Sequence, residues 1–94
     1  MQVKWLRQAL QNLDDEATYI AQDDPRAAAL VVQQILASVA MLAEQPGLGR
    51  PGRVPGTREL VVTKTRYLVP YRVLGRTVEV LRVFHTSRRL PGKW

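Results

Sequence analysis

The chain has 94 residues, of which 46% are hydrophobic and 23% are charged, and its formal net charge is +6. This length suits one compact domain over residues 1–94 and excludes a second core. The absence of cysteine excludes disulfides and thiolate metal sites, and a single histidine argues against a zinc site, so we expect no metal and no cofactor.

The amino-terminal residues 2–5 alternate in polarity and predict a short first strand. Residues 1–7 lack the apolar run that a signal sequence requires, and no later stretch approaches about 18 uninterrupted apolar residues. We therefore expect a cytoplasmic protein that does not bind a membrane.

A first helix is predicted after this strand, because apolar residues recur at steps of three and four. They are Leu6, Ala9, Leu10, Leu13, Ala17 and Ile20. The remaining positions, Glu16 among them, are expected to face water.

A second helix is predicted from Pro25 to about Glu44. Asp24 suits the N-cap because its side chain accepts hydrogen bonds from free amides, and Pro25 suits the first helical position. This helix is apolar almost all the way round, with only a narrow polar edge. It is either a docking surface for a partner chain or second copy, or a central helix enclosed by its own domain.

Residues 46–57 are rich in glycine and proline and predict a structured basic loop. The spacing Gly47-Leu48-Gly49-Arg50-Pro51-Gly52 matches a dinucleotide-binding pattern by letter only, since a helix precedes it and Pro51 removes an amide. Three antiparallel strands are then predicted at 58–63, 67–73 and 77–85, with a tight turn at 74–76. Pro70 lacks an N–H and should lie at a bulge or beside an unpaired edge.

Eleven of the fourteen Lys and Arg residues lie in residues 46–94, beside only two acidic residues. We expect the strand cations to converge on one face of the sheet and attract phosphates or an acidic peptide, although plain solubility is the alternative. Aromatic side chains there could stack a base, and His85 could transfer protons or be merely structural. The set comprises Arg58, Lys64, Arg66, Tyr67, Tyr71, Arg72, Arg82, His85, Arg88 and Arg89.

Four linked segments carry a resemblance to a known family. They are Pro46-Gly47-Leu48-Gly49-Arg50-Pro51, Gly56-Thr57-Arg58-Glu59-Leu60-Val61-Val62, Tyr67-Leu68-Val69-Pro70-Tyr71-Arg72-Val73 and Val80-Leu81-Arg82-Val83-Phe84-His85. With the strand and two helices before them, the chain resembles RelE/ParE superfamily toxins over essentially its whole length. The resemblance implies an α+β fold of order β-α-α-β-β-β, with two N-terminal helices packed on a small, mainly antiparallel sheet.

The resemblance also implies the toxin component of a bacterial type II toxin–antitoxin system. Such a toxin inhibits growth until a cognate antitoxin, with an acidic C-terminal segment, neutralises it; operator DNA is bound only through the antitoxin. ParE-like members poison DNA gyrase, whereas RelE-like members are ribosome-dependent, metal-independent mRNA endoribonucleases. A non-catalytic nucleic-acid-binding module is a further interpretation.

The residues at the positions that correspond to RelE-like catalytic residues favour the interpretation as a gyrase poison. Glu59, Val61 and Leu68 stand where RelE-like enzymes place basic residues, and only Arg88 falls where a phosphate-binding arginine is expected. If the protein is a nuclease, the catalytic residues are expected to be His85, Arg82, Arg66 and Tyr67. Nucleic-acid or antitoxin binding is expected at Arg58, Lys64, Arg72, Arg88 and Arg89.

Overall fold

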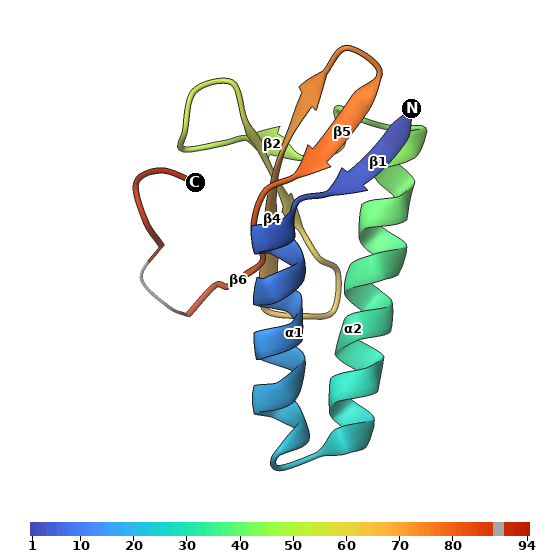
Figure 1. The fold of residues 1–94 in the computed structure, drawn as a ribbon, viewed down its shortest axis with the longest axis vertical. Helices are drawn as coiled ribbons and strands as arrows, with labels where there is room; N and C mark the ends of the chain where they lie inside the picture. Colours follow the sequence, from blue (N-terminus) through green and yellow to red (C-terminus); the bar gives the residue numbers. More distant parts are fainter. Residues whose placement is uncertain (88–89) are drawn as a thin grey trace.

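The computed structural model describes residues 1–87 and 90–94 and consists of two helices packed on a six-stranded sheet (Figure 1). The elements are β1 (Gln2–Trp5), α1 (Arg7–Ala21), α2 (Pro25–Ala40), the 3₁₀ helix η1 (Met41–Ala43), β2 (Arg50–Pro51), β3 (Arg58–Val61), β4 (Tyr67–Leu74), β5 (Thr77–Val80) and β6 (Phe84–His85). The predicted α+β class is confirmed. Two details differ: the Gly/Pro loop contains the short strand β2, and the predicted strand 77–85 is divided into β5 and β6.

The sheet has the order β1-β5-β4-β3-β2, and β6 pairs with β4 beyond the end of β5. Strand β1 runs parallel to β5, from the pair Gln2 and Thr77 to the pair Trp5 and Val80. The other pairings are antiparallel, so the sheet is mainly antiparallel, as predicted.

A bulge divides β5 from β6. Tyr71 pairs with Val80 and Leu68 pairs with Phe84, so the three residues 81–83 lie opposite only two residues of β4. The Leu81 amide donates to the Pro70 carbonyl (2.9 Å), and Pro70 has no N–H to return, which confirms its predicted place at a bulge. The extra residue turns His85, rather than Phe84, to the same face of the sheet as Tyr67.

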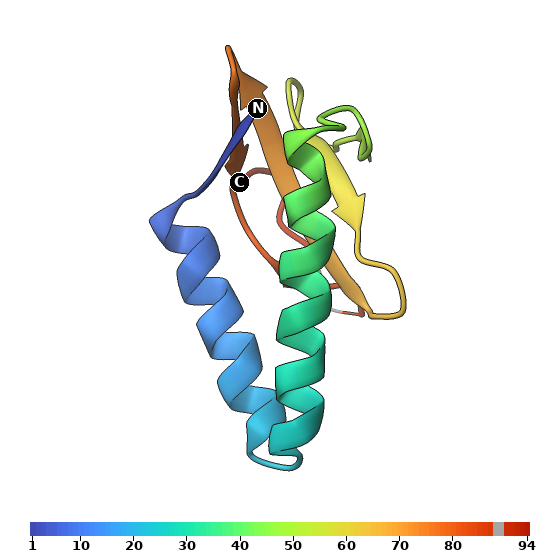
Figure 2. The same cartoon turned by 90° about the vertical axis from the view of Figure 1, so that its right-hand side faces the viewer.

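Helix α2 lies along the sheet, with α1 antiparallel beside it (Figure 2). Its predicted N-cap is confirmed, because the Asp24 carboxylate accepts a hydrogen bond from the Ala27 amide (3.0 Å). One face of α2 places Ile35 and Val39 in the core beside Leu42 of η1. The opposite face is exposed, with Leu30 at 60% and Met41, in η1, at 50%, so the alternative of a fully enclosed helix is wrong.

The stretch Pro25–Ala43 is also long and apolar enough, by length and composition, to cross a membrane. Its buried side chains are already accounted for by packing, since Ile35 and Leu42 are fully enclosed in the core of this domain. Core packing therefore accounts for the buried side chains of this stretch, and the remaining apolar side chains form one exposed face.

Two buried polar side chains hold the Gly/Pro loop against the sheet. The Tyr71 hydroxyl donates to the Pro46 carbonyl (2.7 Å) and accepts from the Gly49 amide (2.8 Å). A Cβ atom at Gly49 would lie 2.7 Å from the Tyr71 ring, so glycine is required for this close approach. Burial raises the pKa of Tyr71 above its ordinary value, although the Gly49 amide and the Arg58 guanidinium oppose that change. Tyr71 is thus a core residue, not the surface stacking residue that we predicted.

Glu59 is the second anchor and is only 3% exposed. Its carboxylate accepts hydrogen bonds from the Arg53 amide (2.8 Å) and Arg53 Nε (3.0 Å), and it lies 3.3 Å from Arg50 Nη2. Burial alone would raise the pKa of Glu59, but the bonds from Arg53 and Arg50 outweigh burial and lower it. One carboxylate is therefore shared by two loop cations, so one net positive charge remains on this cluster.

Candidate functional site

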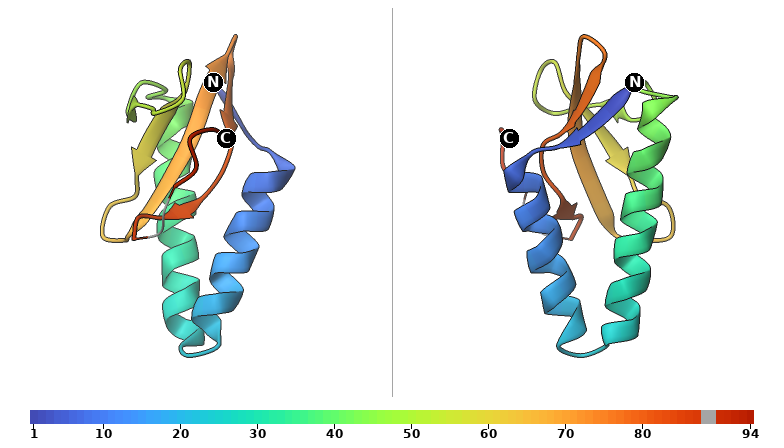
Figure 3. Two further views of the ribbon diagram at one scale, coloured as in Figure 1. Left: turned by 90° about the vertical axis from the view of Figure 1, so that its left-hand side faces the viewer. Right: turned by 45° about the vertical axis from the view of Figure 1, so that its right-hand side comes forward.

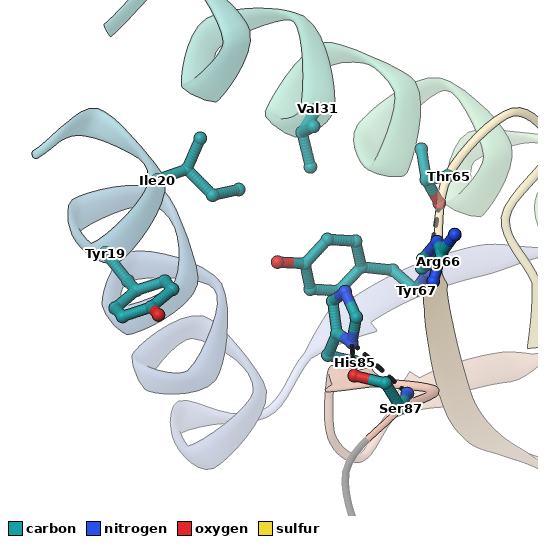
Figure 4. Close-up of a pocket in the computed structure, with 8 residues that line it drawn as sticks. All are labelled: Tyr19, Ile20, Val31, Thr65, Arg66, Tyr67, His85 and Ser87. Atoms are coloured by element: carbon teal, nitrogen blue, oxygen red, sulfur yellow. Dashed lines mark hydrogen bonds between the residues drawn. The ribbon is translucent and has the colours of Figure 1, made fainter. Parts of the chain in front are cut away.

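A pocket of about 480 Å³ opens between the two helices and the start of β4 (Figure 4). Helices α1 and α2 supply apolar and aromatic side chains, and the sheet side supplies polar ones. The lining residues are Tyr19, Ile20, Val31, Thr65, Arg66, Tyr67, His85 and Ser87.

His85 reaches this pocket because β6 pairs it with Tyr67. The two rings meet edge to face, with centroids 5.1 Å apart. The Ser87 amide donates to His85 Nδ1 (3.2 Å), and the Ser87 hydroxyl oxygen lies 2.6 Å from the same nitrogen. Because a backbone N–H can only donate, Nδ1 is an acceptor here and the neutral ring carries its proton on Nε2.

Tyr67 joins the pocket to the first helix. Its hydroxyl donates to the Glu16 carboxylate (3.0 Å), across 51 positions in the sequence. The prediction that Glu16 faces water is therefore wrong. The signal was in the helical spacing, because Glu16 lies three residues after Leu13 and four before Ile20, on the stripe that packs inward.

The structure brings together three of the four residues proposed for a nuclease, namely His85, Tyr67 and Arg66. It places the fourth, Arg82, elsewhere. Arg82 donates to the backbone oxygens of Leu81 (2.7 Å) and Trp94 (2.8 Å) and lines a different pocket. Arg82 lies within the bulge and is held there by these backbone contacts, whereas the pairing of His85 with Tyr67 takes the histidine to the first pocket.

The predicted convergence of cations on one sheet face is wrong. Arg58 donates to the Gly49 carbonyl (2.7 Å) and so supports the Gly/Pro loop, while Arg72 forms an ion pair with Glu79 (2.8 Å). Lys64 lies in the turn before β4 with φ of 65°. Binding by these three residues stays a prediction, and Arg88 and Arg89 lie outside the described residues.

The positions carried over from RelE-like enzymes do not face the pocket. Leu68 pairs with Val61, and Glu59 pairs with Pro70, on the face of β4 opposite to Tyr67. Leu68 is fully buried, Glu59 anchors the loop, and Val61 is 52% exposed. None of these side chains can join His85 in one catalytic site.

The helical hairpin on a mainly antiparallel sheet is shared with solved toxins of ParDE and RelBE systems, and the chain is a toxin of the RelE/ParE superfamily. The family model described as "ParE toxin of type II toxin-antitoxin system, parDE" matches residues 3–90. The chain belongs to this family and is a toxin of a type II toxin–antitoxin system.

The relatives agree with this assignment. The protein Y4kP of Sinorhizobium fredii (strain NBRC 101917 / NGR234) is 47% identical over 89 residues, which cover 95% of this chain and 92% of Y4kP. A chain in the structure of the chromosomal ParDE system from P. aeruginosa is 34% identical, with a TM-score of 0.80, covering 90% of this chain and 95% of that one. A chain of the toxin–antitoxin complex RelBE2 from Mycobacterium tuberculosis is 26% identical, with a TM-score of 0.56, covering 89% of this chain and 88% of that one.

Proposed function

We propose that this toxin acts in the cytoplasm by poisoning DNA gyrase, and that an acidic segment of its cognate antitoxin neutralises it. The family assignment supports the antitoxin partner. The choice of gyrase over messenger RNA rests on the chemistry of the sheet.

One observation carries this choice. An RNA-cleaving site of the RelE type needs several cations around one phosphate, because they stabilise the charge that develops as the phosphodiester breaks. Here Glu59, Val61 and Leu68 occupy those positions, and they lie on the face of the sheet opposite to His85. Inhibition by binding needs no such cluster, so it fits the side chains that are present.

The exposed face of α2 offers the antitoxin an apolar groove. Two adjoining pockets of about 340 and 390 Å³ lie between this helix and the β3–β4 hairpin. Their large apolar side chains are exposed, namely Leu30, Met41, Leu48 and Val61. Arg50 lines one pocket and Lys64 the other, which suits a segment with apolar anchors and flanking carboxylates.

Purified toxin added to a gyrase supercoiling reaction tests the proposal. We expect supercoiling to stop and cleaved gyrase–DNA complexes to accumulate, and we expect added antitoxin to reverse the effect. The parallel assay is translating ribosomes with a defined messenger RNA. Specific cleavage of that messenger with no effect on gyrase would refute the proposal.

A second candidate, an endoribonuclease, is favoured by one specific feature. The pocket unites His85, Arg66 and Tyr67, and the Tyr67 hydroxyl donates to the Glu16 carboxylate, so a proton-transfer group and a cation lie near a carboxylate. His85→Ala separates the two candidates. It should abolish growth inhibition by a nuclease, whereas a gyrase poison should keep most of its activity.

A further inference from the structure

A further pocket, of about 710 Å³, lies beneath the carboxy-terminal segment. Residues 90–94, which we call the C-terminal strap, run across the face of the sheet that the helices leave uncovered (Figure 3, left). The strap supplies Lys93 and Trp94 to the wall, and the loop 54–57 and the strand ends supply the rest.

Trp94 fixes this wall through contacts with three separate parts of the chain. Its ring lies 5.5 Å from the Phe84 ring, and the Arg53 guanidinium lies 5.6 Å from its centroid. Its Nε1 donates to the Thr57 hydroxyl (3.2 Å), and its backbone oxygen accepts from Arg82. The pocket is therefore a built feature, because β6, the loop and the bulge all hold the strap in place.

The lining contains three cations, Arg72, Arg82 and Lys93, and no acidic side chain. Arg72 is paired with Glu79, and Arg82 donates to backbone oxygens of Leu81 and Trp94, whereas Lys93 takes part in none of the ion pairs among the residues that the structure describes. The positive charge of Lys93 thus remains uncompensated beside an apolar floor. That floor is formed by Leu6, Val54, Pro55, Leu74 and Leu81.

This combination suits a peptide better than a nucleic acid. Single-stranded nucleic acids bind by stacking bases on open aromatic faces, but the Trp94 ring is already in contact with Phe84 and Arg53. The aliphatic floor would leave a phosphate backbone desolvated and without partners. An acidic side chain next to a large apolar one would satisfy both the cations and the floor.

We propose that this pocket binds an acidic, amphipathic segment of the protein that the toxin inhibits. The inference rests on the proposed function in requiring a protein target, but it does not require that target to be gyrase. The groove along α2 and this pocket share no lining residue, so antitoxin and target would use separate surfaces. The antitoxin would then block target binding without occupying this pocket, either by covering the toxin sterically or by restricting the toxin's conformation.

The test compares Lys93→Glu with Arg76→Glu in the full chain. Both residues are exposed cations near the same end of the sheet, but only Lys93 lines the pocket. Two quantities are measured: the inducer level needed for growth arrest without antitoxin, and the affinity of purified toxin for the antitoxin. We expect Lys93→Glu to weaken growth arrest by about tenfold or more, because it places a like charge opposite the incoming carboxylate. Arg76→Glu should keep wild-type toxicity. The two variants lower the net charge equally, so their antitoxin affinities should change by the same small amount.

Three results would overturn the inference: unchanged toxicity of Lys93→Glu, equal loss of toxicity in both variants, or a greater loss of antitoxin affinity with Lys93→Glu than with Arg76→Glu. The inference would also be overturned if the wild type bound a fluorescent single-stranded oligonucleotide and Lys93→Glu abolished that binding. The pocket would then be assigned to nucleic acid. Gyrase inhibition is measured in parallel with the same proteins. If the wild type spares gyrase while Lys93→Glu alone loses toxicity, the gyrase proposal fails and the pocket assignment stands.

Discussion

At the scale of single residues, the Gly/Pro loop depends on two buried polar side chains that join it to β3 and β4. Tyr71 holds its beginning through Pro46 and Gly49, and Glu59 holds its middle through Arg53. A buried polar group costs most when its partner is removed, because the remaining group loses water without gaining a bond. The loop's conformation is therefore sensitive to changes of a few atoms at these positions.

Tyr71→Phe should lower the free energy of unfolding by about 1–3 kcal/mol, since it leaves the Pro46 carbonyl and the Gly49 amide without their partner. Urea denaturation measures the loss, and tryptic cleavage after Arg53 reports on the loop itself. Tyr67→Phe is the matched control, because it removes the hydroxyl bonded to Glu16 and leaves the loop contacts intact. Equal rates of loop cleavage in the two variants would contradict the assigned role.

The same side chain predicts a loss of stability in alkali. Burial raises the pKa of Tyr71 in the folded protein. The Tyr71 hydroxyl therefore makes its full contribution to the free energy of unfolding below the ordinary pKa of 10.0, and this contribution is lost as pH rises through the higher folded-state pKa. Unfolding free energies measured from pH 9 to 12 should fall more steeply for the wild type than for Tyr71→Phe. Parallel curves would show that the phenol does not contribute.

Glu59 predicts the opposite dependence in acid. The pKa of Glu59 is lowered from 4.5 in the folded protein. The carboxylate therefore makes its full contribution to the free energy of unfolding above pH 4.5, and this contribution is lost as pH falls through the lower folded-state pKa. Glu59→Gln should be less stable at pH 7 by about 1–3 kcal/mol and should show a flatter decline between pH 5 and 2. Urea denaturation at a series of pH values checks both, and an identical decline in the two proteins would count against the buried ion-pair assignment.

At the scale of the elements, the hairpin between α1 and α2 depends on the cap at Asp24. Asp24→Ala should destabilise the protein by about 1 kcal/mol, because the Ala27 amide at the start of α2 loses its acceptor. Asp23→Ala is the control, since it removes the neighbouring carboxylate without removing the cap. Thermal unfolding distinguishes them, and similar melting temperatures would argue that the cap contributes little.

The elements also show which structural features a sequence can predict. Local signals located both helices, the Asp24 cap and the central strands, because each depends on spacing within a few residues. The bulge at 81–83 was not located, since it depends on how Pro70 meets a strand that follows it in the chain. Pro70 signalled a bulge but not its position, and this one-residue uncertainty decided which side chain, His85 or Phe84, enters the pocket.

The candidate site was predictable in part for the same reason. The four residues were grouped from the family resemblance; His85, Tyr67 and Arg66 do meet, whereas Arg82 lines a different pocket. Glu16 was missed because its partner, Tyr67, is 51 positions away, and Ser87 was missed because its contact with His85 depends on a turn after β6. Contacts between distant segments follow from the tertiary fold, which spacing alone does not specify.

At the scale of the whole molecule, charge is uneven along the chain and is partly compensated within the fold. The net charge of +6 remains after Glu59 and Glu79 neutralise nearby arginines, so the protein attracts acidic partners from a distance. Association with an acidic antitoxin segment should slow by about tenfold between roughly 0.05 and 0.5 M salt, while dissociation changes much less. Stopped-flow measurement of both rates checks this, and a salt-independent association rate would rule out electrostatic steering.

The parallel pairing of β1 with β5 has a consequence for how the toxin is made. The first strand cannot pair with its neighbour until Thr77–Val80 has left the ribosome, after both helices and the other long strands have been synthesised. The nascent toxin therefore carries an unfinished sheet throughout the synthesis of the residues between β1 and β5. During this interval the first strand has no partner, and the growing polypeptide lacks the completed sheet on which the folded domain is built.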